Sequence, residues 1–372
     1  MKIAMVFPYA PSYRDAIYRL MDEKMDIDWY FAENCKPSLK LLDYSVLKNV
    51  DLSLKEYRIG PFSTLKGCSS ARFKSYDAII IPGVFRCLSD LMLMLKHRQG
   101  STPKLFLWTH GWYGKESKIE KSIKHFCYKN LDGIFVYGDR AKKLMIAEGF
   151  DGDRIFPIHN SLNYKKQLSL RKYLLENNSN LFKTHFKNDF PTIIFIGRLT
   201  SVKRLDMVLD ALSILNGQNE LFNLVFVGNG PEKDLLEKKA MSLNLSDRVW
   251  FYGECFDEEI NASLIYNADL CVSPGNVGLT SIHAMMFGCP VISNDDFDHQ
   301  MPEFEAIKPN KTGIFFKAYD TEDLAQSISG WFKLNQFKRG EVRNECFKVI
   351  DEEWNPDYQY NVLAKAIEDA LK

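Results

Sequence analysis

Two segments in the second half of the chain combine residue types that bind phosphate groups. Arg198 follows an apolar run, and Lys203 lies near the start of the next helical pattern. Farther along, the glycine-rich turn Gly275–Thr280 opens another helical pattern. Free N–H groups and the positive dipole end at a helix start attract an anion, while a guanidinium and an ammonium neutralise a diphosphate. These segments predict a diphosphate site, and a sugar nucleotide is the ligand we expect.

The composition restricts the classes of partner. The 372 residues, 46% of them hydrophobic, exceed the size at which one core usually stops growing, so two domains are expected. Lys plus Arg equals Asp plus Glu at 48 each, which argues against binding to nucleic acid. The 8 cysteines lack metal-ligand spacing, and no apolar run is long enough to cross a bilayer. We expect a cytoplasmic protein with reduced thiols.

Short apolar runs alternate with helical patterns, which is typical of parallel sheets built from βαβ units. The expected strands are Lys2–Phe7, Asp77–Ile81, Lys104–Leu107, Gly133–Val136 and Arg154–Ile158 in the first half, and Thr192–Ile196, Leu224–Val227, Val249–Tyr252, Leu270–Val272, Pro290–Ile292 and Gly313–Phe316 in the second. A polar stretch with a weak helical pattern around Leu168–Leu175 separates the halves. We predict an α/β protein with doubly wound domains at 1–170 and 191–352, a linker at 171–190 and a C-terminal helix within 353–372.

The second half resembles the donor-binding lobe of family 4 glycosyltransferases, which are retaining enzymes of the GT-B fold. The resemblance covers nearly all of Thr192–Phe332, through FIGRLTSVKRLDMVLDAL, FVGNGPEKDLLEKKA, VWFYGECFDEEINASLIYNADLCVSP, GNVGLTSIHAMMFGCPVIS, MPEFEAI and NKTGIFF in order. The first half matches more loosely, through WTHG at Trp108–Gly111 and through GIFVYGDRAKKLMIAEGF followed by DRIFPIHNSLN. The resemblance implies two Rossmann-like domains facing a central cleft. The first would bind the acceptor, the second would bind the nucleotide sugar, and the terminal helix would cross back to the first.

The resemblance assigns the donor to residues of the second half. Arg198 and Lys203 would grip the diphosphate, with ordinary surface charge as the alternative. The loop Gly253–Phe256 would meet the base, and Thr280 or Ser281 is expected to cap the helix that follows the glycine turn. The implied donor contacts are Arg198, Lys203, Gly228, Glu254, Cys255, Asn276, Val277, Gly278, Leu279, Thr280, His283 and Glu303. For Gly228 a tight structural turn explains the residue equally well.

The chain departs from the family at two positions. Most members carry two glutamates across this turn, the first touching the donor sugar and the second the ribose hydroxyls, and Gly275 and His283 stand at those positions. His283 can still donate and accept one hydrogen bond each, or it is a packing residue of its helix. For the first glutamate, a backbone amide, Asn276, or a carboxylate of Glu303 or Glu305 would have to substitute.

In the first half, His110 is the candidate catalytic residue. It matches a family histidine near the donor sugar, and an ordinary polar loop residue is the alternative. Arg14, Gly83 and Arg86 follow expected strands. We expect them at the carboxyl edge of the sheet, where open α/β folds bind ligands, as acceptor or anion contacts.

The implied reaction moves a sugar from a nucleotide sugar to a glycan or lipid-linked glycan, in surface polysaccharide or glycoconjugate biosynthesis. Uracil is the commoner base of the donor in the family, so UDP is the expected nucleotide and GDP is the alternative. The departing diphosphate would take the acceptor's proton, so retention of configuration needs no protein nucleophile, cofactor or metal. Two rivals stay open. The missing glutamates suggest a non-catalytic sugar-nucleotide-binding protein, and the DxD pattern Asp296–Asp298 suggests a metal-dependent transferase.

The segment Trp112–Lys129 predicts a basic amphipathic helix. It interleaves lysines with apolar residues at helical spacing, namely Lys115, Lys118, Lys121, Lys124 and Lys129 with Ile119, Ile123, Phe126 and Tyr128. Such a helix is typical of peripheral contact with an anionic membrane, and a solvated surface helix is equally consistent with the pattern.

Overall fold

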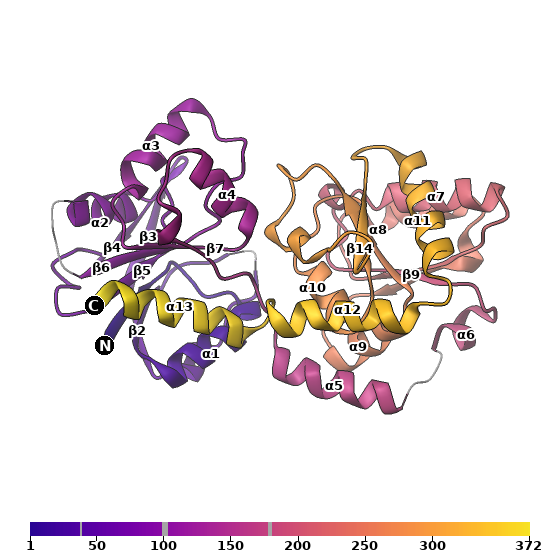
Figure 1. The fold of residues 1–372 in the computed structure, drawn as a ribbon, viewed down its shortest axis with the longest axis horizontal. Coiled ribbons are helices and arrows are strands. Elements are labelled where there is room, and N and C mark those ends of the chain that lie inside the picture. Colours follow the sequence, from indigo (N-terminus) through magenta and orange to yellow (C-terminus); the bar gives the residue numbers. More distant parts are fainter. Residues whose placement is uncertain (38, 99–102, 178–180) are drawn as a thin grey trace. The chain divides into compact units, whose positions relative to one another are not determined.

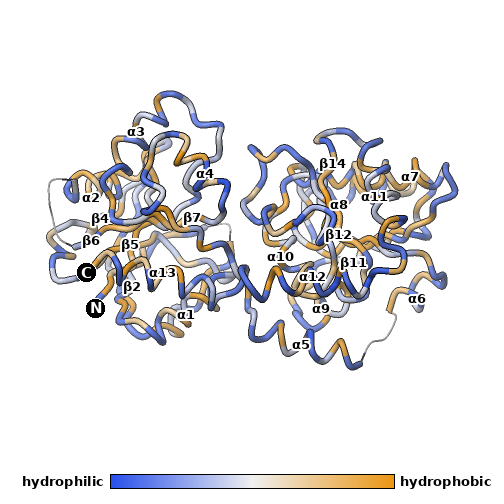
Figure 2. The backbone as a smooth tube through the Cα atoms, in the orientation of Figure 1, coloured by the Kyte–Doolittle hydropathy of each residue, from blue (hydrophilic) through white to orange (hydrophobic). Residues whose placement is uncertain are grey.

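The computed structural model describes residues 1–37, 39–98, 103–177 and 181–372, and the chain divides into two compact units (Figure 1). The first unit comprises Met1–Asn163 and Asn355–Lys372, and the second comprises Tyr164–Trp354. Each contains one sheet with helices around it. Hydrophobic residues concentrate along the central strands of each sheet (Figure 2), so each unit buries a core of its own.

The sheet of the first unit has 8 strands in the order β4-β3-β2-β1-β5-β6-β7-β8. They are β1 (Lys2–Val6), β2 (Asp26–Ala32), β3 (Asn49–Ile59), β4 (Phe62–Lys66), β5 (Ala78–Ile81), β6 (Lys104–Trp108), β7 (Gly133–Val136) and β8 (Ile155–Pro157). The five expected strands of this half are confirmed to within one residue at each end. All pairs are parallel except β3 with β4, which are antiparallel.

Three strands of the first unit, β2, β3 and β4, escape the sequence pattern. β2 reads DIDWYFA, and its two aspartates interrupt the apolar run although its later residues are buried. β3 and β4 lie at the edge of the sheet, where most of their side chains are exposed. A strand near an edge needs no continuous apolar run, so periodicity does not reveal it. The antiparallel β4 corrects the expectation of a purely parallel sheet.

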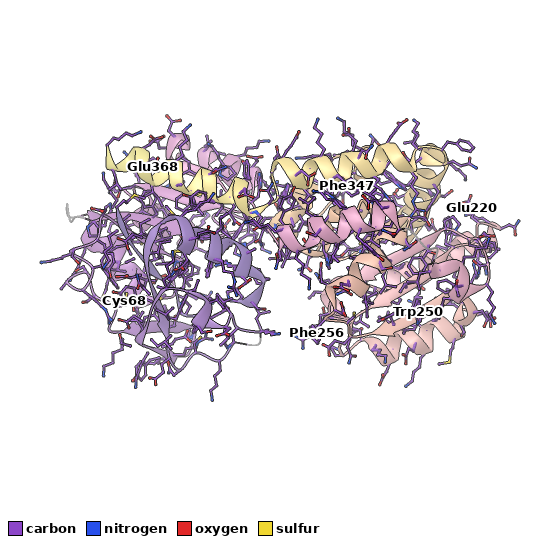
Figure 3. The ribbon with its side chains drawn as sticks, turned by 90° about the horizontal axis from the view of Figure 1, so that it is seen from below. Cys68, Glu220, Trp250, Phe256, Phe347 and Glu368 are labelled. Atoms are coloured by element: carbon purple, nitrogen blue, oxygen red, sulfur yellow. The ribbon has the colours of Figure 1, made fainter. Side chains whose placement is uncertain are left out.

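The C-terminal helix α13 (Pro356–Leu371) belongs to the first unit. Asn355 caps its N-terminus by accepting a hydrogen bond from the Tyr358 amide at 2.9 Å, and Pro356 occupies the first turn. Leu363 and Ile367 are fully buried in the core of this unit, where α13 packs against α1 (Asp15–Lys24). Glu368 lies on the solvent side of α13 (Figure 3). The other helices of the unit are α2 (Leu88–Arg98), α3 (Lys118–Tyr128) and α4 (Asp139–Ala147).

The sheet of the second unit has 6 parallel strands in the order β11-β10-β9-β12-β13-β14. They are β9 (Thr192–Ile196), β10 (Asn223–Val227), β11 (Val249–Gly253), β12 (Leu270–Ser273), β13 (Val291–Asn294) and β14 (Gly313–Phe316), all close to the expected ranges. The helices are α5 (Tyr164–Glu176), α6 (Leu181–Phe186), α7 (Asp206–Gly217), α8 (Lys233–Ser242), α9 (Glu258–Asn267), α10 (Thr280–Met286), α11 (Thr321–Asn335) and α12 (Arg339–Glu352).

The division between the units falls earlier than the sequence predicts. It lies between Asn163 and Tyr164, whereas the sequence indicated a boundary at 170 and a linker at 171–190. Much of that stretch is helical, because α5 packs against α9 and its buried Arg171 forms an ion pair of 2.8 Å with Asp351. Residues 178–180 of the expected linker lie outside the described ranges. The chain returns to the first unit after Trp354.

Only Lys118–Tyr128 of the segment expected to be a basic helix is helical, as α3, and its charged face also differs from the prediction. Lys124 is buried, with its Nζ atom 2.9 Å from Glu116 Oε1, and Lys121 forms an ion pair with Glu148. Two of the five lysines are therefore neutralised by the protein's own carboxylates. The exposed residues of the segment include Lys115, Lys118, Ile119, Phe126 and Lys129. Within the described ranges, none of the helices has both the length and the hydrophobicity of a membrane span.

Candidate functional site

The strand order of the second unit creates a switch point at β9. This strand pairs with β10 on one side and with β12 on the other, and the chain changes sides after β11. Open α/β sheets bind ligands beyond the carboxyl ends of their strands at such a point. The loop that follows β9 carries Arg198 and Lys203 at this position. The topology therefore places the two expected cations where a ligand of this fold class binds.

Glycines allow the loop after β9 to pack against the loops on both sides of it. A Cβ atom at Gly228, after β10, would lie 2.0 Å from the carbonyl oxygen of Gly197. A Cβ atom at Gly275, after β12, would lie 2.0 Å from the carbonyl oxygen of Val202. Only glycine permits such an approach of one backbone to another. Gly228 thus has a structural role, and its contact with a donor stays a prediction.

Lys203 joins the loop after β9 to the turn after β12. Its Nζ atom donates hydrogen bonds to the main-chain oxygen of Asn276 at 2.7 Å and to the Oδ1 atom of the same residue at 2.9 Å. The Gly275 amide donates in return to the Lys203 carbonyl oxygen at 2.8 Å. Burial lowers the pKa of Lys203, and the charge of Glu303 raises it by a smaller amount. The ammonium is thus a fixed part of the turn, with one N–H left for a ligand.

Arg198 differs from Lys203 because its side chain is exposed. Across the part of the chain that the structure describes, its guanidinium forms no hydrogen bond and no ion pair. A guanidinium without a partner at the carboxyl edge of the sheet can bind a phosphate with two parallel hydrogen bonds.

The glycine turn offers fewer amides than the sequence suggests. The Val277 amide donates to the buried Gln300 Oε1 atom at 2.7 Å. This amide is therefore not free to make the ligand contact that we expected from Val277. The amides of Gly278, Leu279 and Thr280 have no acceptor among the described residues. They precede the first hydrogen bonds inside α10 and are the amides available to an anion.

The hydroxyls of Thr280 and Ser281 do not cap α10, contrary to the sequence-based expectation. Leu279 is the N-cap residue, without a side-chain bond. The Thr280 hydroxyl donates to the Ile196 carbonyl oxygen at the end of β9, at 2.9 Å, and the Ser281 hydroxyl donates to the Glu303 carbonyl oxygen at 2.9 Å. Both hydroxyls hold the turn against neighbouring loops instead.

Two buried amide side chains, which the sequence analysis missed, hold the glycine turn through hydrogen bonds. Asn294 Nδ2 donates to the carbonyl oxygens of Pro274 at 2.7 Å and Gly275 at 2.9 Å. Gln300 Nε2 donates to the Ser293 hydroxyl at 3.0 Å, while its Oε1 atom accepts from the turn. Neither residue lies in a recognisable motif. Asn294 is the polar residue that ends the apolar run of β13, and Gln300, six residues farther on, carries no signal in the sequence.

His283 and a carboxylate from another helix lie in contact. The Nε2 atom of His283, on α10, is 2.9 Å from Glu258 Oε1, in the first turn of α9. Gln167 Nε2, on α5, donates to the same oxygen at 2.8 Å. Burial alone would raise the pKa of Glu258, but the hydrogen bond and charge of His283, together with the hydrogen bond from Gln167 and the charge of Lys166, more than offset it and lower the pKa. Sequence analysis gave Glu258 no role.

The loop after β11 is exposed at its tip. Gly253, with φ 91°, accepts a hydrogen bond of 2.7 Å from the Gly228 amide, which ties this loop to the turn after β10. Glu254 is exposed, and Cys255 is half-buried. The ring of Phe256 projects from the unit with 84% of its surface exposed (Figure 3). This ring is a flat apolar face on the loop that the resemblance assigns to the base, and its contact with a base stays a prediction.

In the first unit, His110, Arg14 and Tyr137 form one cluster at the carboxyl ends of β1, β6 and β7. Arg14 Nη1 donates to the Tyr18 hydroxyl at 3.0 Å, and Nη2 donates to the Tyr137 hydroxyl. The rings of His110 and Tyr137 are 4.8 Å apart, centroid to centroid. Burial, Arg14 and Lys124 together lower the pKa of His110 to about 4. The imidazole is therefore neutral at pH 7.

Gly83 and Arg86 make hydrogen bonds with residues outside this cluster. Gly83 has φ 66°, and its carbonyl oxygen accepts a hydrogen bond of 2.6 Å from the Tyr128 hydroxyl. The Arg86 side chain is exposed, and its carbonyl oxygen accepts from the Ser63 amide at 2.9 Å. In the described ranges, neither residue hydrogen-bonds to Arg14 or to His110. Their expected contact with an acceptor stays a prediction.

The neutral state of His110 predicts a pH-dependent stability. The pKa of this histidine is 6.5 in the unfolded chain and about 4 in the folded protein. The free energy of unfolding therefore keeps its full value above pH 6.5 and decreases as the pH falls towards 4. Between pH 7.5 and 5, the first unit should lose about 2 kcal/mol from this group. Denaturant unfolding of wild type and His110→Gln at both pH values measures it. Equal pH dependence of the two proteins would contradict the assignment.

The DxD pattern is engaged with its own neighbours. The Asp296 carboxylate lies 2.9 Å and 3.0 Å from His299 Nδ1 and accepts from the Tyr319 hydroxyl at 3.5 Å. Among the described residues, no group of three or more His, Cys, Asp or Glu side chains is arranged to hold a metal ion.

The sequence of this chain is similar to a family model and to several curated proteins. Residues 176–346 match the family model of glycosyl transferases group 1. The chain is 26% identical over 315 residues to an uncharacterized glycosyltransferase of Haemophilus influenzae, covering 83% of this chain and 76% of that protein. It is 25% identical over 209 residues to mannosylfructose-phosphate synthase of Agrobacterium fabrum, covering 53% of this chain and only 41% of that relative.

Among solved structures, Anabaena HepE in complex with UDP superposes with a TM-score of 0.73 at 14% identity, covering 99% of this chain and 100% of that one. This likeness and the two doubly wound units confirm the expected GT-B fold. Residues 176–346 are thus similar to glycosyl transferases group 1, and the relatives that align with more of the chain include a glycosyltransferase.

Proposed function

We propose that the protein transfers a sugar from a nucleoside-diphosphate sugar to a glycan or lipid-linked glycan, with retention of configuration. We favour UDP over GDP as the nucleotide, and surface polysaccharide or glycoconjugate biosynthesis as the context. The observation that carries the proposal is the position of two cations on one loop at the switch point. They are Arg198, whose guanidinium has no partner among the described residues, and the half-buried Lys203. The complex of HepE with UDP supports the choice of nucleotide by analogy.

In this proposal the protein binds and orients the donor and stabilises the charge that develops on its diphosphate. The bond between the anomeric carbon and the diphosphate oxygen breaks while the acceptor oxygen attacks the same face, and the acceptor's proton passes to the departing diphosphate. Arg198 and Lys203 would hold that diphosphate, and the amides after Gly278 would donate to it. His110, neutral at pH 7, would act on the sugar as a hydrogen-bonding group and not as a cation. Arg14 would contact an anionic group of the acceptor.

The proposal includes no resident metal or cofactor, because two cations of the chain supply the positive charge and Asp296 is committed to His299. It also includes peripheral contact with anionic lipid. The exposed Ile119 and Phe126 beside Lys115 and Lys118 support such contact, and co-sedimentation with anionic vesicles at low salt would test it.

A non-catalytic sugar-nucleotide-binding protein is the second candidate. It is favoured by Gly275, because the backbone around this residue leaves no room for the side chain that touches the sugar in related sequences. Such a protein would bind the donor and release no product.

A panel of UDP- and GDP-sugars tests the proposal. The matching donor should raise the unfolding temperature of the protein, because a ligand that binds only the folded state stabilises it. With that donor and a glycan acceptor, NMR of the product should show the anomeric configuration of the donor. An inverted linkage would refute the mechanism, binding without turnover would favour the second candidate, and no binding of any nucleotide would refute both.

A further inference from the structure

The carboxylate of Glu258 lies between two loops of the candidate site. It stands in the first turn of α9, directly after the loop that follows β11. His283, its partner, stands one turn into α10, directly after the glycine turn. The contact of 2.9 Å between them therefore joins the loop expected to meet the base with the turn expected to meet the phosphates. The sugar that connects base and phosphate in a nucleotide is the ribose.

The two oxygens of this carboxylate have different surroundings. Oε1 receives hydrogen bonds from both His283 and Gln167, which are on different helices. Oε2 has no hydrogen-bond partner in the part of the chain that the structure describes, and the side chain is 22% exposed. One oxygen is thus fixed by the protein, and the other is open to a ligand.

The charge state of the group decides what that ligand offers. An ionised carboxylate only accepts hydrogen bonds, so the proton between the two residues lies on His283 Nε2. The lowered pKa of Glu258 keeps the group ionised at neutral pH. Its open oxygen therefore needs a donor, and adjacent hydroxyl groups are the donors that a nucleotide carries next to its phosphates. Two side chains already hold this half-buried carboxylate in place, so it loses little conformational entropy when it binds the hydroxyl groups of a nucleotide.

We propose that Glu258 binds the ribose hydroxyls of the donor nucleotide and that His283 and Gln167 position its carboxylate for this contact. The inference rests on the proposed function and adds to it a specificity-determining residue that does not lie on α10. His283 is then a positioning residue and not itself the ligand of the ribose. A histidine alone would offer only one donor and one acceptor, whereas the carboxylate can accept from two hydroxyls at once.

Binding of UDP and of 2′-deoxy-UDP to the full-length protein tests this role. Wild type should bind UDP about tenfold more tightly than the deoxy nucleotide, since a hydrogen bond to a charged group is lost. In Glu258→Gln, affinity for UDP should fall by at least that factor, whereas affinity for 2′-deoxy-UDP, which keeps only the 3′-hydroxyl, should fall less, so that the discrimination between the two nucleotides is largely lost. His283→Gln should reduce the discrimination part of the way, because the carboxylate loses one of its two supports. If guanine is the base, GDP and 2′-deoxy-GDP take their places.

Glu259→Gln is the matched control. Glu259 lies in the same first turn of α9 and is exposed, so its loss changes the charge near the helix start equally. Discrimination between the two nucleotides should survive in this variant. A Glu258→Gln protein that keeps full discrimination, or that loses both nucleotides to the same extent, would overturn the inference while leaving the proposed function intact. A wild-type protein that binds neither nucleotide would instead refute the proposed function itself.

Discussion

Replacing Arg198 and Lys203 together by alanine should remove nearly all affinity for the nucleotide-sugar donor. Each charge-assisted hydrogen bond to a diphosphate contributes about 1.5–3 kcal/mol, so the single variants should each weaken binding by roughly 10- to 150-fold. Isothermal titration of each variant with the donor selected from the nucleotide panel measures the loss.

The two single variants should differ in stability, because the two cations differ in their contacts. Arg198 is exposed and without a partner in the described ranges, so Arg198→Ala should unfold at the temperature of the wild type. Lys203 holds Asn276 through two hydrogen bonds, so Lys203→Ala should also loosen the glycine turn. Lys238→Ala, at an exposed position on α8, controls for loss of positive charge. Unchanged donor affinity in both single variants would contradict the diphosphate site.

The sequence predicts the cations of this site because its chemistry is local along the chain. Arg198 and Lys203 lie on one loop, and the strand before them is a buried apolar run that periodicity reveals. A parallel sheet brings the ends of its strands to one edge, so the glycine turn after β12 could be expected near that loop. The roles of these residues towards a donor stay predictions, but their proximity follows from strand order alone.

Other parts of the site could not be predicted, because they depend on contacts between segments far apart in sequence. Glu258 meets His283 and Gln167 only after three helices have packed together. Likewise, the sequence suggests that the Val277 amide is free, because this residue lies in a turn. In the folded unit, however, this amide donates to Gln300 Oε1. The pattern of a turn identifies its free amides, whereas the buried side chains that use them come from the tertiary structure.

The division between the units shows the same limit. The stretch after Asn163 is polar and lysine-rich, so composition indicates a linker. The structure makes it α5 because Arg171 is buried against Asp351, a residue close to the far end of the second unit. This contact joins a buried arginine to an exposed carboxylate far away in sequence, so no local propensity reveals it.

The glutamate that related sequences carry at position 275 should be harmful in this protein. Sequence alignment alone suggests that Gly275→Glu restores a missing sugar contact. However, any Cβ atom at this position would lie 2.0 Å from the Val202 carbonyl oxygen and 2.6 Å from the carbonyl carbon of Lys203. The backbones must separate, which breaks the hydrogen bond of 2.8 Å from the Gly275 amide to Lys203 and displaces Asn276 from the ammonium. We expect a loss of about 2–3 kcal/mol in the stability of the second unit, together with most of the donor affinity.

Comparison with alanine separates steric from electrostatic causes. The clash begins at the Cβ atom, so Gly275→Ala should lose almost as much stability as Gly275→Glu, although it adds no charge. Gly278→Ala is the matched control for stability in the same turn, because its Cβ atom would lie 3.8 Å from its nearest neighbour, Met301 Cγ. Thermal unfolding and donor titration of the three variants measure both effects. If Gly275→Glu instead gained donor affinity or transfer rate, the loops would be free to rearrange. The packing of the loops around position 275 would then not require glycine, and a glutamate at this position could restore the contact with the sugar.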